Sequence, residues 1–89
     1  AELAMLEQTA QDVLRARAMS AGVSLIDPGS VTLHHDTKLA ADVVIEPNVF
    51  FAGGVSVAGG ARIRAFSYLE GVKIGADAII GPFARLRPE

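Results

Sequence analysis

Two arginines near the end of the chain are the residues best suited to binding a small anion. Arg85 and Arg87 flank Leu86 within residues 80–88, IGPFARLRP. Alternate residues of a strand project to the same face, so both guanidinium groups should point outward from one strand. A planar guanidinium suits the oxygens of a phosphoryl or pyrophosphoryl group. The pair therefore indicates a phosphate clamp, and two exposed arginines that make surface ion pairs are the alternative.

A histidine pair next to an aspartate is the other cluster with possible chemistry. His34 and His35 precede Asp36, and the chain has no further histidine. Adjacent residues of a strand point to opposite faces, so one strand cannot offer both imidazoles to one metal ion. We expect no metal site here and interpret these side chains as exposed.

Neither the remaining acidic residues nor any known catalytic or nucleotide-binding motif indicates a reaction. No nucleotide-binding glycine motif, nucleophile elbow or H-E-x-x-H zinc motif occurs in the sequence. The acidic side chains lie at scattered positions without an evident partner, and we expect them to be solvated: Asp42, Glu46, Glu70 and Asp77.

A six-residue repeat is the element that must position these side chains. Large apolar residues recur at every sixth position, apart from one step of five, at Leu33, Leu39, Ile45, Phe51, Val57, Ile63, Leu69, Ile74, Ile80 and Leu86. Each hexapeptide fits one short strand and one corner, and three of them make one coil of a triangular prism. The predicted fold is a mainly β, parallel β-helix of about three coils with three apolar columns inside. The columns are Leu33–Phe51–Leu69–Leu86, Leu39–Val57–Ile74 and Ile45–Ile63–Ile80.

Small or β-branched residues form a second column four positions after the first, from Thr37 through Val43 to Ala84. The five-residue step from Leu69 to Ile74 brings Lys73 into this column. We expect a tightened corner there, with Lys73 turned outward rather than serving a ligand. We also expect Leu86 to be exposed at an unpaired last coil.

A helix precedes the repeat. Strong helix formers run from Glu2 to about Ala21, and Gly22 stands where a helix C-cap belongs. An apolar stripe should pack against the rest of the protein, with a polar face opposite, and we prefer this interpretation to a helix on a membrane surface. The stripe is predicted to contain Leu3, Leu6, Ala10, Val13, Leu14 and Arg17, and the polar face Glu7, Gln11 and Arg15. Residues 23–28 should form a hinge.

Composition limits the class of protein. The chain has 89 residues, a net charge of −2 and no cysteine, so disulfides and thiolate metal sites are excluded. Interspersed charges give no sign of nucleic acid or an anionic membrane as a partner. The sequence has no signal peptide and no apolar run of membrane-spanning length, and we expect a cytoplasmic location. It begins with Ala, and we expect it to be a piece of a longer chain.

The helix, residues 21–31 (AGVSLIDPGSV), the hexapeptides and residues 81–88 (GPFARLRP) together resemble one known family. It is the bacterial bifunctional N-acetylglucosamine-1-phosphate uridyltransferase and glucosamine-1-phosphate N-acetyltransferase. The resemblance covers nearly the whole chain. It implies a left-handed β-helix, with residues 1–22 as a helical linker arm and residues 23–89 as the start of the acetyltransferase domain.

The resemblance also implies a function. The family acetylates glucosamine-1-phosphate with acetyl-CoA and then transfers UMP from UTP with Mg²⁺, which gives UDP-N-acetylglucosamine for peptidoglycan and lipopolysaccharide. Its subunits form a homotrimer through their β-helices. Arg87 matches the family's arginine that binds the sugar phosphate, whereas Arg85 matches no assigned role.

The chain departs from the family in what it lacks. The family's catalytic histidine, the other sugar-site residues and the acetyl-CoA contacts belong to later coils, and the uridyltransferase metal ligands belong to another domain. The resemblance therefore implies that these residues alone bind neither acetyl-CoA nor Mg²⁺ and are inactive. The alternatives are a non-catalytic trimerisation module and another hexapeptide acyltransferase or sugar nucleotidyltransferase.

Overall fold

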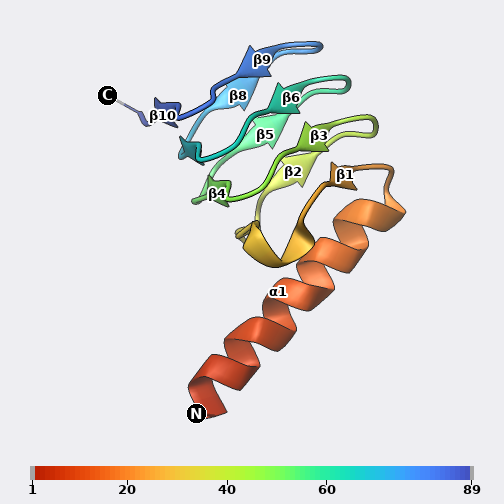
Figure 1. The fold of residues 1–89 in the computed structure, drawn as a ribbon, viewed down its shortest axis with the longest axis vertical. Coiled ribbons are helices and arrows are strands. Elements are labelled where there is room, and N and C mark those ends of the chain that lie inside the picture. Colours follow the sequence, from red (N-terminus) through yellow and green to blue (C-terminus); the bar gives the residue numbers. More distant parts are fainter. Residues whose placement is uncertain (1, 89) are drawn as a thin grey trace.

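The computed structural model describes residues 2–88, with side chains from Met5 onward. In this part of the chain one helix is followed by a stack of ten short strands (Figure 1). The helix α1 spans Glu2–Ser20, and a 3-10 turn spans Pro28–Ser30. The strands are β1 (Ser24–Leu25), β2 (Lys38–Leu39), β3 (Val44–Ile45), β4 (Phe50–Phe51), β5 (Ser56–Val57), β6 (Arg62–Ile63), β7 (Tyr68–Leu69), β8 (Lys73–Ile74), β9 (Ile79–Ile80) and β10 (Arg85–Leu86).

The strands pair in parallel as three sheets, which are the three faces of a solenoid. Their orders are β1-β3-β6-β9, β4-β7-β10 and β2-β5-β8. The coils rise in Figure 1 from β1, next to the helix, to β9 at the far end. The fold is the predicted left-handed parallel β-helix, and it has about four turns rather than three because the first sheet gains β1.

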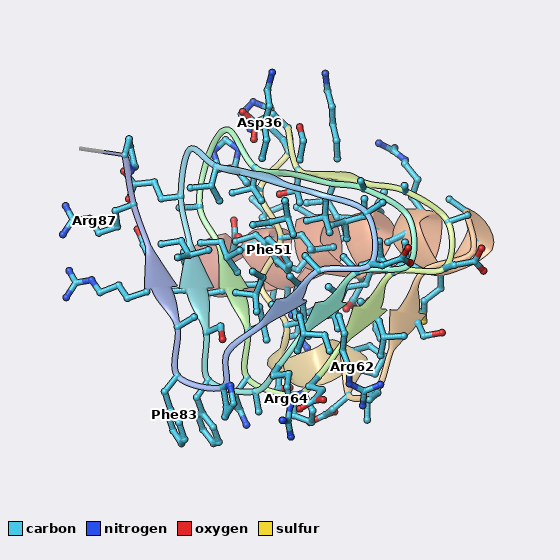
Figure 2. All side chains as sticks on the ribbon, turned by 90° about the horizontal axis from the view of Figure 1, so that it is seen from above. Asp36, Phe51, Arg62, Arg64, Phe83 and Arg87 are labelled. Carbon is cyan, nitrogen blue, oxygen red and sulfur yellow. The ribbon has the colours of Figure 1, made fainter. Side chains whose placement is uncertain are left out.

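The three predicted interior columns are confirmed by the strand register. Phe51 pairs with Leu69 and Leu69 with Leu86, while a bridge from Thr32 to Phe50 sets Leu33 next to Phe51. The other two columns pair as predicted through Leu39–Val57–Ile74 and Ile45–Ile63–Ile80. Figure 2 shows Phe51 in the middle of the coils. Burial of each such side chain contributes about 1.5–3 kcal/mol before entropy is counted.

Residues 23–28 are not the hinge that the sequence predicted. Val23 and Leu25 are buried in the core, and Leu25 pairs with Ile45 at the foot of a sheet. This first coil could not be recognised from the sequence, because the 3-10 turn Pro28–Ser30 lengthens it and breaks the six-residue period before Leu33. The solenoid therefore starts directly after the helix.

The five-residue step tightens one corner, as predicted, but Lys73 does not enter the column of small residues. Val72 takes that place: its carbonyl accepts a hydrogen bond from the Ser56 amide, and its side chain packs on the core. Lys73 is exposed on the outer face of β8. Gly71 makes the short corner with φ +60°, and its amide donates to the Gly53 carbonyl. The shortened corner leaves the strand register intact.

The helix ends as predicted at Gly22. This residue has φ +96°, and the Val23 amide donates to the Ala18 carbonyl at 3.1 Å, which is the bonding of a Schellman cap. The cap turns the chain directly into β1.

Among the described residues no helix is long and apolar enough to span a membrane.

The helix face that packs on the solenoid shares Leu14 with the predicted apolar stripe but otherwise differs from it. Leu6 and Val13 are 67% and 51% exposed, while Gln11 is buried. The Gln11 amide nitrogen donates to the Leu33 carbonyl at 2.7 Å, and the Leu33 amide donates to the Gln11 side-chain oxygen at 2.9 Å.

Arg15, also placed on the polar face, donates from Nε to the Val31 carbonyl at 3.0 Å. Leu14 and Ala18 pack on the core from the same side of the helix. The helix therefore closes the first coil with polar groups that satisfy its backbone. The side chain of Leu3 lies outside the described residues.

Candidate functional site

The arginine pair lies at the far end of the β4-β7-β10 sheet. Arg85 stands in β10 and pairs with Tyr68 of β7, which in turn pairs with Phe50 of β4. Arg87 follows β10 at the level of Glu70, whose amide donates to the Leu86 carbonyl. Both arginines are exposed, and Figure 2 shows Arg87 extending away from the coils. Leu86 between them is half-buried rather than exposed as predicted.

The surroundings of the arginines are partly aromatic and partly acidic. The Tyr68 and Phe50 rings stack with centroids 5.5 Å apart. The Tyr68 hydroxyl donates to Glu70 Oε1 at 2.7 Å, and this hydrogen bond, with desolvation and the carboxylate charge, raises the pKa of Tyr68. The positive charges of Arg87 and Arg85 oppose that rise in pKa. Tyr68 and Glu70 therefore form a coupled polar pair next to the arginines.

Neither arginine forms an ion pair within the described part of the chain. The surface ion pairs considered as the alternative interpretation are therefore not seen among these residues. Two exposed guanidinium groups two residues apart can donate to the oxygens of one phosphoryl group. The geometry supports an anion site at Arg85 and Arg87.

The histidine pair does not lie on a strand, so the geometric argument made from the sequence is wrong. His34 and His35 precede β2 in a corner, and their ring centroids are 4.2 Å apart. His34 Nδ1 lies 2.7 Å from Asp36 Oδ1. Among the residues that the structure describes, no three His, Cys, Asp or Glu side chains form a group that could hold a metal ion.

Asp36 instead fastens one coil to the next. Its two carboxylate oxygens each accept a hydrogen bond from the Gly54 amide at 3.1 Å. This backbone donor, followed by the bond and charge of His34, lowers the pKa of Asp36 against the effect of burial. Asp36 is therefore part of a corner that links successive coils.

Not all of the scattered acids are simply solvated. Glu46 Oε2 lies 2.7 Å from Arg62 Nε and 3.5 Å from Arg64 Nε, and Glu46 Oε1 accepts from the Ala65 amide at 3.2 Å. The sequence did not reveal this cluster because Arg62 lies sixteen residues away, one coil further along. Asp42 and Asp77 are exposed, as expected.

Sequence reasoning also missed the placement of the lysines. Lys38 and Lys73 both line a groove between α1 and the β2-β5-β8 sheet, together with Arg17 of the helix. The signal that was available is the spacing of Lys38, Ser56 and Lys73, which lie one coil apart and pair in register.

Comparison with known proteins places the chain among larger relatives. No protein-family model matches the chain. The bifunctional protein GlmU of Sphingopyxis alaskensis is 56% identical over 88 residues, which is 99% of this chain and 20% of the relative. GlmU of Hyphomonas neptunium is 54% identical over 87 residues, covering 98% of this chain and 19% of the relative. GlmU of Sinorhizobium fredii is 53% identical over 88 residues, covering 99% of this chain and 19% of the relative.

The chain thus spans about a fifth of the length of these relatives. The similarity runs from the helix to the arginine pair without a large gap in coverage. With this identity over nearly all of its residues, the chain is homologous to one segment of the bifunctional GlmU proteins.

Proposed function

We propose that this chain works as a segment of a bifunctional enzyme that makes UDP-N-acetylglucosamine. One reaction acetylates glucosamine-1-phosphate with acetyl-CoA, and the other transfers UMP from UTP. The product would serve peptidoglycan and lipopolysaccharide synthesis in the cytoplasm. The observation that carries the proposal is the identity of 53–56% to GlmU proteins over almost the entire chain. The helix and the β-helix of this chain lie within that segment.

Within this enzyme the helix is the linker arm and the solenoid is the start of the acetyltransferase domain. Residues 1–22 form the first part and residues 23–89 the second. The sharp cap at Gly22 and the immediate entry into β1 support a boundary at this point. Glu89 lies outside the described residues.

Arg87 is the proposed contact to the phosphate of glucosamine-1-phosphate. It is exposed, lies at the end of the last strand of its sheet, and has no ion pair among the described carboxylates. A guanidinium in this state can direct two parallel N–H donors at a phosphate without first breaking a protein contact. Its role is to hold and orient the sugar phosphate.

The solenoid also provides the surface for a homotrimer. Its outer faces carry apolar side chains in the open, among them Ile79, Phe66 and Phe83, which are 69%, 57% and 74% exposed. The Phe66 and Phe83 rings stack with centroids 5.4 Å apart, and Figure 2 shows Phe83 at an outer corner. Contact with other subunits would remove this apolar surface from water.

Acetyl-CoA and Mg²⁺ are proposed to bind outside this segment. The described residues contain no cluster of three or more His, Cys, Asp or Glu side chains that could hold a metal ion. The chain by itself is then expected to bind neither group and to catalyse neither reaction. Its own contribution is to position the arm, the first coils and Arg87.

The test replaces the matching segment of the Sphingopyxis alaskensis protein with residues 1–88 of this chain. In that chimera Arg87→Ala should raise the KM for glucosamine-1-phosphate by about tenfold to a hundredfold, because a charge-assisted phosphate contact is lost. The rate of uridylyl transfer should stay unchanged. Arg64→Ala removes the same charge from an exposed arginine outside the arginine pair and serves as the matched control.

An unchanged KM and an unchanged acetyl-transfer rate in Arg87→Ala would contradict the substrate role and favour a non-catalytic trimerisation module. Acetylation by the 89-residue chain alone would contradict the proposal that the essential groups lie elsewhere. Another hexapeptide acyltransferase would be indicated by a chimera that acetylates a different acceptor.

A further inference from the structure

A groove runs between α1 and the outer face of the β2-β5-β8 sheet, and we name it the lysine groove. Leu14, Arg17 and Ala18 of the helix form one wall. Lys38 and Lys73 stand on the opposite wall, which is the sheet. The groove has a volume of about 680 Å³. This volume is typical of a site for a small organic molecule, which usually occupies about 300–1,000 Å³.

The groove gathers positive charge. Lys38 and Lys73 are the only two lysines of the chain, and both face this groove. Each pairs in register with Ser56, which places the serine hydroxyl between the two lysines on the outer face of the sheet. Arg17 adds a third cation from the helix. Three cations therefore line one groove, with the Ser56 hydroxyl between the two lysines, although the chain as a whole has a net charge of −2.

This charge is not neutralised within the described residues. Arg17, Lys38 and Lys73 form no ion pair there, whereas Arg15, Arg62 and Arg64 each pair with a carboxylate. No aspartate or glutamate lines the groove. The lysines stand two strands apart, which is about 10 Å, and their long flexible stems allow both ammonium groups to approach one anion.

The floor of the groove is apolar. It includes Ala21, Ala40 and Ala58, whose small side chains leave room between the helix and the sheet, and Leu14 and Ala18 continue this apolar lining along the helix wall. An ion such as inorganic phosphate would satisfy the lysines and leave this floor in contact with water. A ligand with both an anionic group and an apolar body would use both parts of the groove.

We propose that the lysine groove binds a phosphate ester with a compact apolar body. The phosphate lies between Lys38 and Lys73, with Ser56 as a hydrogen-bond donor and Arg17 on the opposite wall. The apolar body lies on Leu14, Ala18 and the alanines of the sheet corner. The volume of about 680 Å³ lies within the range of small-molecule sites, so a small molecule is the proposed occupant. This site lies on a different face of the solenoid from Arg87.

The experiment titrates the folded 89-residue chain with three probes and follows backbone amide shifts by NMR. The probes are 1-naphthyl phosphate, inorganic phosphate and 1-naphthol, which carry both features, the anion alone and the apolar body alone. We expect 1-naphthyl phosphate to bind about tenfold more tightly than either of the others. The shifts should centre on residues 38–40, 56–58 and 73–74 and on the last turns of α1.

Two double variants, each of which removes two positive charges, locate the binding site. Lys38→Gln with Lys73→Gln should weaken naphthyl phosphate binding at least about tenfold, because both charged donors are lost. Arg62→Gln with Arg64→Gln removes the same charge from another face, outside both proposed phosphate contacts, and should leave this binding unchanged. Circular dichroism on each variant shows whether the helix and the thermal midpoint are retained.

Several results would overturn the proposal. One is weakening by the arginine variant and not by the lysine variant, which would place the ligand at the other face. Equal binding of naphthol and naphthyl phosphate would show an apolar groove without anion recognition. Loss of self-association in the lysine variant, measured by sedimentation, without any effect on naphthyl phosphate binding would show that a second copy of the chain occupies the groove.

Discussion

Gln11 pairs with the first coil in the way that a neighbouring strand would. Its amide group both donates to and accepts from the backbone of Leu33, at 2.7 and 2.9 Å, in a buried position. An open sheet edge carries unpaired N–H and C=O groups that invite pairing with another chain. One side chain on a helix here satisfies two of them.

Gln11→Ala should therefore lower the free energy of unfolding by about 2 kcal/mol or more, since it leaves a buried donor and a buried acceptor without partners. Urea denaturation followed by circular dichroism measures the change. Gln8→Ala, on the exposed side of the same helix, should have almost no effect. Equal stability of the two variants would mean that water replaces the Gln11 contacts without cost.

The sequence could not place Gln11 or Arg15, and the reason is physical. Helix faces are assigned from apolar periodicity, but the end of a solenoid presents backbone polar groups, so the helix packs there with a polar residue. Arg87 is different: its exposure followed from strand alternation alone. Its proposed ligand came only from the resemblance.

At the scale of the elements, successive coils are joined by polar clamps as well as by the core. Glu46, next to β3, reaches the following coil and meets Arg62 Nε at 2.7 Å and the Ala65 amide at 3.2 Å. The hydrogen bond from Arg62 is the main cause that lowers the pKa of Glu46, and burial opposes it. The clamp holds two coils in register at one corner.

A lowered pKa in the folded state gives a stability contribution that is complete above the unfolded pKa of about 4.3 and is lost as the pH falls through the folded value. Glu46→Gln should therefore be less stable than the wild type at about pH 7, and the difference should shrink below about pH 4. Urea unfolding across this pH range measures it. Asp77→Asn, at an exposed corner, is the control, and a difference that grows at low pH would contradict the clamp.

The elements themselves were largely predictable from the repeat. Ten ladder positions, spaced by six residues apart from one step of five, predicted the strand register, because each inward side chain must stack on the one a coil below. The inward position of Leu25 was not predicted, because the 3-10 turn at Pro28–Ser30 interrupts the six-residue period. At Gly71 the sequence showed the missing residue but not that Val72, rather than Lys73, would fill the column. The local backbone conformation of this corner determines which of the two residues enters the column.

At the scale of the whole molecule, one continuous core runs through all coils while the outer faces differ in chemistry. One sheet presents Phe50, Tyr68 and Arg85, and another presents Lys38, Ser56 and Lys73. Inward positions are fixed by stacking, and outward positions are free to vary. The outer faces of the solenoid can thus carry different chemistry without any change in its interior.

The shared core predicts cooperative unfolding. Ile63 is fully buried in a middle coil, so Ile63→Ala should cost about 2–5 kcal/mol through lost burial and the cavity that remains. Ile79→Ala, 69% exposed on the next coil, should cost far less. Urea unfolding should show a single transition in which the helix signal and the β signal change together. Separate midpoints for helix and solenoid would contradict this.

The restriction of both lysines to one groove has a practical consequence. Reagents that couple to side-chain primary amines can attach only at Lys38 and Lys73, which stand on the same strand ladder. A surface coupled through these lysine side chains would hold the molecule by the β2-β5-β8 face, with the arginine-bearing sheet left open to solution. The native sequence therefore already provides a directed attachment point for immobilised assays.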